Sequence, residues 1–131
     1  MESFEITLPP GGTPSNLSSV VAALNEPRLS LSPVASPTLA NVIRVTHDDN
    51  LLGWEVGSEA IVCSRDILLQ FELSSREFMG RAYVVLIALF KTHNGERGYG
   101  LLTVHANDHA WLRKAASDIA SFLKLNVSDK T

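Results

Sequence analysis

The pattern of hydrophobic and polar positions predicts that a β-hairpin over residues 81–105 is the centre of the fold. Its first half, residues 82–90, is an unbroken apolar run rich in β-branched and aromatic side chains, which is typical of a central strand. Asn94-Gly95 predicts a tight turn, because a type I′ turn needs positive φ at both central positions. With these two residues as the loop, Phe90 of the first strand faces Tyr99 of the return strand.

This register gives the hairpin two apolar faces. One face combines apolar walls with a few polar groups, as small-molecule pockets do, and Trp111 from the following helix is added to it. The alternative is that these residues are simply core residues. The candidate ligand-binding residues are Leu86, Phe90, Tyr99, Leu101, Thr103, His105 and Trp111.

The second face of the hairpin predicts an interface. One C-terminal helix covers only one face of a sheet, and a short helix over residues 15–24 offers few apolar residues for the other face. Large apolar patches usually mark an interface, and two-fold dimers are the commonest oligomers. We therefore expect a homodimer that packs through Val85, Ile87, Leu89, Leu102 and Val104.

The rest of the chain predicts a meander of short strands followed by a long helix. Alternating or apolar runs predict strands over residues 3–8, 42–47, 51–56, 60–63 and 67–73, and an apolar stripe predicts a helix over 107–125. Residues 28–40 form a connection rich in proline and serine, and we expect residues 126–131 to fray. The order predicts one α+β domain over residues 1–131, with an antiparallel sheet of six to seven strands wrapped on the C-terminal helix.

Composition narrows the classes of function. The chain has 131 residues, of which 45% are hydrophobic and 19% are charged, and its net charge is −3. The acidic balance argues against a nucleic-acid partner, and the longest apolar run is far shorter than the roughly 20 residues that span a bilayer. A single cysteine, Cys63, excludes an internal disulfide. We expect a cytoplasmic protein without a membrane partner or a cofactor.

The residues that could carry chemistry have simpler explanations. His105 and His109 are four positions apart, but a strand ends at one and a helix begins near the other, so the helical spacing of a zinc site fails. His47-Asp48-Asp49 lies at a predicted turn, where aspartate bonds to nearby backbone. Cys63 lies in an apolar strand and predicts a core residue. No catalytic or metal-binding residue is assigned.

Several strings carry a resemblance to a known superfamily. They are the start from Ser3 to Gly11, Thr92-His93-Asn94 followed by Gly98-Tyr99, and His109 before the last helix. Together with the element order, they resemble the helix-grip superfamily of START, polyketide-cyclase and birch-pollen-allergen-like proteins, and an uncharacterised bacterial family within it. The resemblance implies a curved sheet around the C-terminal helix with a cavity between them. The strand order is also similar to a pleckstrin-homology-like barrel with a C-terminal helix.

The function expected from the sequence is non-catalytic binding of a small hydrophobic ligand. The first alternative is a protein-interaction or dimerisation module without a ligand, and the second is a cyclase-type enzyme that uses the same cavity. The interior discriminates between them, because a ligand-binding domain needs a cavity of roughly 300 Å³ or more. A packed interior favours an interaction module.

Overall fold

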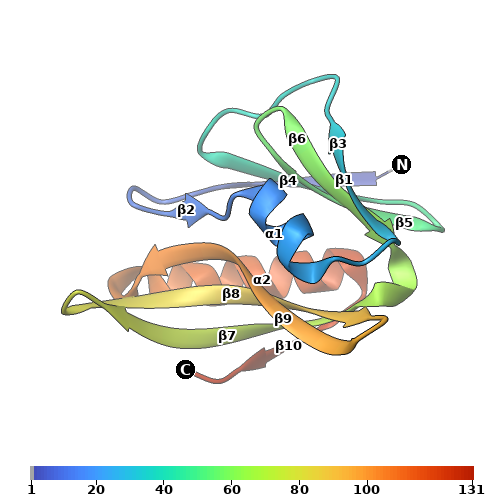
Figure 1. Cartoon of the computed structure of the whole chain (residues 1–131). Coiled ribbons are helices and arrows are strands. Elements are labelled where there is room, and N and C mark those ends of the chain that lie inside the picture. The colour runs from blue at the N-terminus through green and yellow to red at the C-terminus, as the bar shows by residue number, and fades with distance from the viewer. Residues whose placement is uncertain (1) are drawn as a thin grey trace.

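The computed structural model describes residues 2–131 as two β-sheets with two helices between them (Figure 1). The strands are β1 (Glu2–Thr7), β2 (Thr13–Pro14), β3 (Leu29–Pro33), β4 (Val42–His47), β5 (Leu51–Val56), β6 (Glu59–Ser64), β7 (Leu68–Phe78), β8 (Arg81–Thr92), β9 (Gly95–His105) and β10 (Asn126–Asp129). The helices are α1 (Leu17–Leu24) and α2 (His109–Leu123), with 3₁₀ turns at Arg65–Ile67 and Ala106–Asp108.

The strands form two five-stranded sheets. Sheet A has the order β1-β4-β5-β6-β3, and sheet B has the order β10-β7-β8-β9-β2. The α+β class and the C-terminal helix are confirmed, but one sheet of six to seven strands is wrong. The chain leaves sheet A after β6 through the 3₁₀ turn Arg65–Ile67 and enters the second layer at β7. Ile67 is fully buried in that turn, so the turn anchors the passage between the layers.

Two short strands lie where the sequence predicts a connection and a frayed end. β3 lies within residues 28–40 and pairs with β6. The buried side chain of Leu29 holds it against the core. β10 lies within residues 126–131 and pairs with β7, and this pair is parallel. Lys130 continues the attachment, since its N–H donates to the Leu73 carbonyl and its Nζ lies 2.8 Å from Glu72 Oε1. The expected connection and the expected frayed tail are therefore partly strand.

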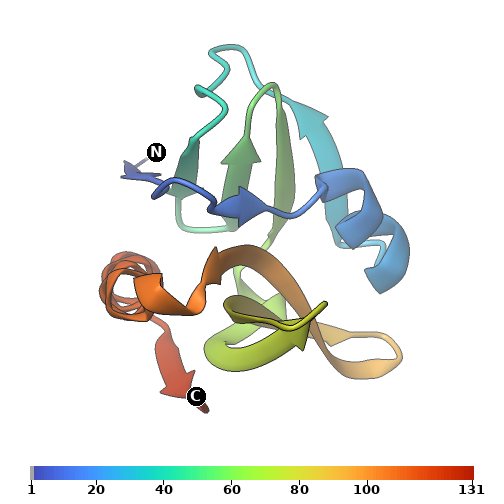
Figure 2. The same ribbon diagram turned by 90° about the vertical axis from the view of Figure 1, so that its left-hand side faces the viewer.

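The helices fill the space between the sheets at opposite sides (Figure 2). The apolar stripe predicted for the C-terminal helix is confirmed, because Leu112, Ala116 and Ile119 are fully buried. α2 contacts β7, β8 and β9 of sheet B and also β1 of sheet A. α1 contacts β3 and β6. Neither helix lies on the outer face of sheet B, so the inner face alone is covered within residues 2–131.

The β8–β9 hairpin has a different register from the predicted one. Its loop is His93-Asn94, with Thr92 opposite Gly95, and Phe90 faces Arg97. The Thr92 hydroxyl closes this loop, because it donates to the Gly95 carbonyl and accepts the Asn94 N–H. Leu101 is an extra residue on β9, a β-bulge between the pairs Ile87–Gly100 and Leu86–Leu102.

The bulge exchanges the faces of β9 beyond it. On the turn side, Tyr99 shares the inner face with Ala88, as predicted. Past Leu101, Leu102 and Val104 face the core and are fully buried, while Thr103 and His105 face outward. The predicted division of the hairpin is therefore wrong over the second half of β9, because one inserted residue inverts the alternation of side chains.

A buried carboxylate joins α1 to the turn of this hairpin. The Glu26 side chain is only 2% exposed, and it accepts the backbone N–H groups of Arg28 and His93 and the guanidinium of Arg28. Hydrogen bonds from the side chain and backbone of Arg28 lower the pKa of Glu26 to about 2. Arg28 also donates to the Lys91 carbonyl, so the chain after α1 is held to the end of β8.

Candidate functional site

The interior between the two sheets is packed. The cavity left there has a volume of about 20 Å³ and is lined by core side chains that include Trp54, Phe90 and Leu101. Ligand pockets in proteins have volumes of roughly 300–1,000 Å³. Three of the predicted ligand-binding residues, Leu86, Phe90 and Leu101, are buried core residues of this interior.

The structure does not bring the other predicted ligand-binding residues together. Tyr99 is partly buried against the core, whereas Thr103 and His105 lie on the outer face of sheet B. The His105 ring stacks on Tyr83 with ring centroids 5.2 Å apart. Trp111 lies in α2 and lines a surface groove beside β1. The seven residues therefore belong to the core, the outer face and a separate groove.

Three of the five predicted interface residues form a row on the outer face of sheet B. Val85, Ile87 and Leu89 of β8 are half-buried, and no helix or strand of residues 2–131 covers them. They lean over glycines of β9, because a Cβ built on Gly100 would lie 2.8 Å from Val85 Cγ1. Leu102 and Val104, the other two, lie on the inner face and are fully buried.

The tip of the β7–β8 hairpin presents two exposed apolar side chains. Phe78 is 67% exposed and Met79 is 86% exposed, so neither side chain packs onto the domain. Met79 and Gly80 form the turn with φ of +51° and +74°. Turns with positive φ favour glycine, asparagine or aspartate, so methionine here is unfavourable for the backbone. The Met-Gly pair between two strand patterns is the signal in the sequence that could have located this tip.

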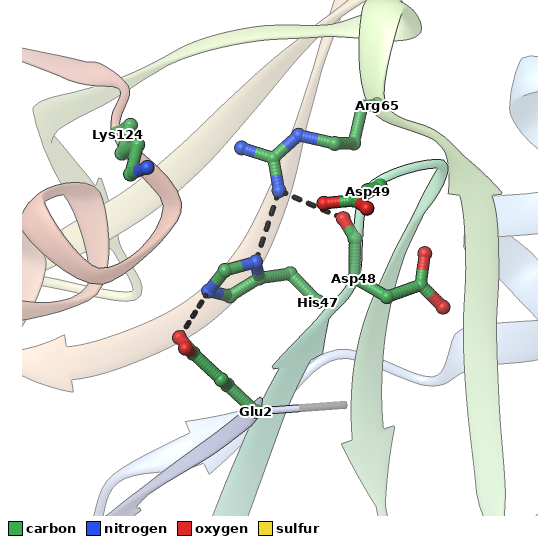
Figure 3. Close-up of a pocket in the computed structure, with 6 residues that line it drawn as sticks. All are labelled: Glu2, His47, Asp48, Asp49, Arg65 and Lys124. Carbon is green, nitrogen blue, oxygen red and sulfur yellow. Dashed lines mark hydrogen bonds and ion pairs between the residues drawn. The ribbon is translucent and has the colours of Figure 1, made fainter.

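A polar pocket of about 460 Å³ lies where the end of α2 meets sheet A (Figure 3). Its lining residues come from distant parts of the chain, and they are Glu2, His47, Asp48, Asp49, Arg65 and Lys124. Arg65 is its central cation. The guanidinium lies 3.0 Å from His47 Nδ1 and donates to the carbonyls of Asp48 and Leu123.

The bonds of this pocket give it a structural explanation. Arg65 satisfies the Leu123 carbonyl at the C-terminus of α2, where a cation is favoured by the helix dipole. The Asp48 carboxylate accepts the N–H groups of Asn50 and Leu51, which lowers the pKa of Asp48 and confirms the predicted turn. The pocket therefore fastens α2 to the end of strand β4.

The His47 ring has no free basic nitrogen in this arrangement. A guanidinium only donates, so Nδ1 accepts from Arg65 and the ring proton of the neutral form lies on Nε2. Nε2 is buried and lies 3.0 Å from Glu2 Oε2, without the alignment of a hydrogen bond. The contact with Arg65 thus fixes the orientation of the His47 ring, and the pocket offers charges of both signs.

No family model, curated protein or solved structure matches this chain. The resemblance to the helix-grip superfamily therefore stays a prediction, and so does the similarity to a pleckstrin-homology-like barrel. Across residues 2–131, no helix has both the length and the apolar content needed to cross a membrane.

Cys63 lies in the core of sheet A and is almost fully buried. Burial raises the pKa of its thiol to about 12. The thiolate is the form of cysteine that acts as a nucleophile or a metal ligand. Because Cys63 stays a buried thiol at neutral pH, it is unreactive in the folded protein. Its role is packing, as the apolar strand around it predicts.

Proposed function

We propose that this chain is a non-catalytic protein-interaction domain that forms a homodimer through the outer face of sheet B. The observation that carries the proposal is the uncovered apolar row on the central strand of that sheet. The row occupies every second position of β8, at Val85, Ile87 and Leu89. These residues are not fully buried, and no other element of residues 2–131 covers them. Phe78 lies in β7, next to the turn that leads into β8, and is largely exposed.

The borders of this row suit pairing with a second copy. On the β9 side the neighbours of the row include Gly98 and Gly100, which bring no charge and let another side chain approach closely. On the β7 side the residues opposite the row are Gln70, Glu72 and Ser74. Glu72 already has Lys130 as its ion-pair partner at 2.8 Å. Two such faces can stack without burying an unpaired charge, which would be unfavourable.

The packed interior favours the interaction module over the small-ligand alternative. A cavity of about 20 Å³ is too small for a metabolite or a lipid chain. Binding of a small hydrophobic ligand stays a prediction that would need one of the surface grooves. The cyclase-type alternative requires the same interior cavity, so the small size of that cavity argues against it as well. The histidine of the polar pocket, His47, is held by its contact with Arg65.

The test is the mass of the protein in solution, measured by light scattering at micromolar concentration. We expect the wild type to have twice the mass of one chain, and the variant Ile87→Glu to have the mass of one chain, because a carboxylate in an apolar interface is strongly unfavourable. Val62→Glu is the matched control, since Val62 is a half-buried β-branched residue of β6 in the other sheet.

Circular dichroism shows whether each variant remains folded. A monomeric wild type contradicts the homodimer. A dimeric Ile87→Glu protein, or a monomeric Val62→Glu protein, contradicts the face that we assign to it. If Ile87→Glu fails to fold, the smaller change Ile87→Ser is measured by the same method, and it should weaken the dimer.

A further inference from the structure

β1 is an edge strand whose outer side is open to pairing. It pairs with β4 over all six of its residues and has no neighbour on its other side in the described chain. Edge strands of natural proteins are usually protected by charged side chains, above all lysine, by proline or by a bulge. β2 and β3 contain Pro14 and Pro33, but β1 has no proline, no basic residue and a continuous register, and its charged residues are Glu2 and Glu5.

The register identifies the backbone groups on the open side. The Leu8 N–H donates to the Asn41 carbonyl at 2.7 Å, and these two residues continue the β1–β4 register. Hydrogen-bonded residues alternate along an antiparallel strand, so Phe4 and Ile6 also bond toward β4. Ser3, Glu5 and Thr7 therefore direct their N–H and C=O groups away from sheet A.

A groove runs along this open edge between β1 and α2. Its volume is about 560 Å³, and both elements contribute to its lining. Figure 2 shows β1 at the open side of sheet A and α2, seen end-on, next to it. Phe4 and Trp111 are partly buried apolar residues of the lining, and Ile6 and Ala115 are buried beneath them. The lining is thus largely apolar on the side that faces α2.

Two of the polar residues at the groove are paired with one another. Lys114 Nζ lies 2.9 Å from Asp118 Oδ2 on the exposed surface of α2. On the other face of β1, Arg44 is shared by Glu5 at 2.8 Å and Glu55 at 2.9 Å. Two carboxylates with one guanidinium leave that face with one negative charge in excess.

We propose that the groove between β1 and α2 binds an extended peptide segment of another protein, which joins sheet A as a strand beside β1. The outward N–H and C=O groups of Ser3, Glu5 and Thr7 bond to the backbone of the peptide. Alternate side chains of the peptide enter the groove beside Trp111, and these are apolar or aromatic. The side chains between them lie near Glu5, where basic residues are favoured. Such strand addition combines backbone affinity with side-chain specificity.

A second copy of the chain is a poorer occupant of this edge. β1 carries Glu2 and Glu5 and has no basic residue. Antiparallel pairing of β1 with itself centred on Glu5, which pairs Ser3 with Thr7, would place the Glu5 side chains of both copies opposite each other, and like charges across a strand pair are destabilising. This site is separate from the outer face of sheet B, so the peptide groove does not depend on the proposed homodimer.

The test uses selection of peptides from a random dodecapeptide library displayed on phage, with the folded wild-type protein as bait. We expect enriched peptides to have apolar residues at every second position with basic residues between them. A synthetic copy of the most enriched peptide is then titrated into isotope-labelled protein. We expect amide signals of Ser3, Glu5 and Thr7 and the indole signal of Trp111 to shift on binding.

Two variants test the two halves of the site. Glu5→Pro removes an outward N–H without removing a hydrogen bond to β4, and it should weaken binding at least about tenfold, whereas Glu5→Ala keeps the N–H and should weaken binding less. Ala110→Arg places a long side chain in the groove from an exposed position of α2 and should also weaken binding at least about tenfold. Ser117→Arg is the matched control on the exposed side of α2 outside the groove lining, and it should bind like the wild type.

Several outcomes would overturn the proposal. They are the absence of enriched peptides, amide shifts confined to sheet B or the polar pocket, and unchanged affinity of Ala110→Arg. Chemical shifts of the unbound variants show whether they are folded, and Ala110→Arg decides the matter if Glu5→Pro does not fold. A change of protein mass that depends on β1 in the absence of peptide would identify a second copy as the occupant instead.

Discussion

The two faces of strand β8 are almost equally apolar, yet they have different surroundings. On the inner face Val84, Leu86 and Phe90 are at most 3% exposed, because sheet A and α2 cover them. On the outer face Val85, Ile87 and Leu89 are only half-buried, with glycines among their neighbours on β9. An apolar row in a sequence therefore indicates that a face excludes water, but it does not tell whether the same chain or another one covers it.

Replacing a leucine on the inner face should have the largest effect on stability. Leu86→Ala should reduce the free energy of unfolding by about 2–5 kcal/mol, since it leaves a cavity in a packed interior. Ile87→Ala on the outer face is the matched variant and should cost about 1 kcal/mol or less in the monomer. Urea denaturation measures both values.

The concentration dependence of this pair sharpens the comparison further. If the outer face is a dimer interface, the loss of stability caused by Ile87→Ala grows with protein concentration, because the wild type gains stability from the dimer and the variant gains less. The loss caused by Leu86→Ala should depend much less on protein concentration, because Leu86 lies on the inner face. Equal losses for both variants at low concentration would contradict the difference between the two faces.

A methyl group added between the outer row and β9 should have an intermediate effect. Gly100→Ala places a Cβ 2.8 Å from Val85 Cγ1, and Val85 is β-branched and cannot easily move aside. We expect a loss of about 1–3 kcal/mol in the free energy of unfolding, as for other overpacked sites. Gly98→Ala is the milder change for comparison, because a Cβ there would lie 3.0 Å from the flexible end of Leu89 and 3.1 Å from Ile87 Cγ2. A loss for Gly98→Ala as large as that for Gly100→Ala would contradict the close packing of Val85.

The effect of Glu26, at the turn end of β8, depends on pH. Glu26 has a pKa of about 2 in the folded protein against an ordinary value of 4.5, so its carboxylate contributes stability that is complete above pH 4.5 and is lost as the pH falls toward 2. Glu26→Gln should therefore lower the midpoint of thermal unfolding at neutral pH. The difference from the wild type should shrink as the pH falls through that window. A difference that does not change with pH would mean that the charge of Glu26 is unimportant.

The sequence predicts the local elements better than their assembly. The α+β class, the strands β4, β5 and β6 and the apolar stripe of α2 follow from periodicity, because each depends on side chains a few positions apart. The division into two sheets depends on the single turn Arg65–Ile67, which resembles an ordinary hairpin turn in the sequence. The bulge at Leu101 has no periodic signal, and it places Thr103 and His105 opposite to their predicted face.

The candidate sites are still harder to predict, because they join distant residues. Glu2, His47 and Arg65 meet only when β1, β4 and the turn after β6 are in place. The groove beside β1 depends on α2, which begins more than a hundred residues after that strand. Trp111 lines this groove, but the strand beside it cannot be predicted from the spacing of residues.

The order of strands along the chain has a consequence for folding during synthesis. All five strands of sheet A lie before residue 65, whereas sheet B combines β2 with strands that end at Asp129. Domains emerge from the ribosome amino-terminus first, so we expect sheet A to pair before sheet B has emerged completely. Its inner residues, such as Ile43 and Trp54, then face water until α2 and β10 complete the second layer. The nascent chain is therefore most prone to aggregation in the interval between the emergence of Ser64 and that of Asp129 from the ribosome.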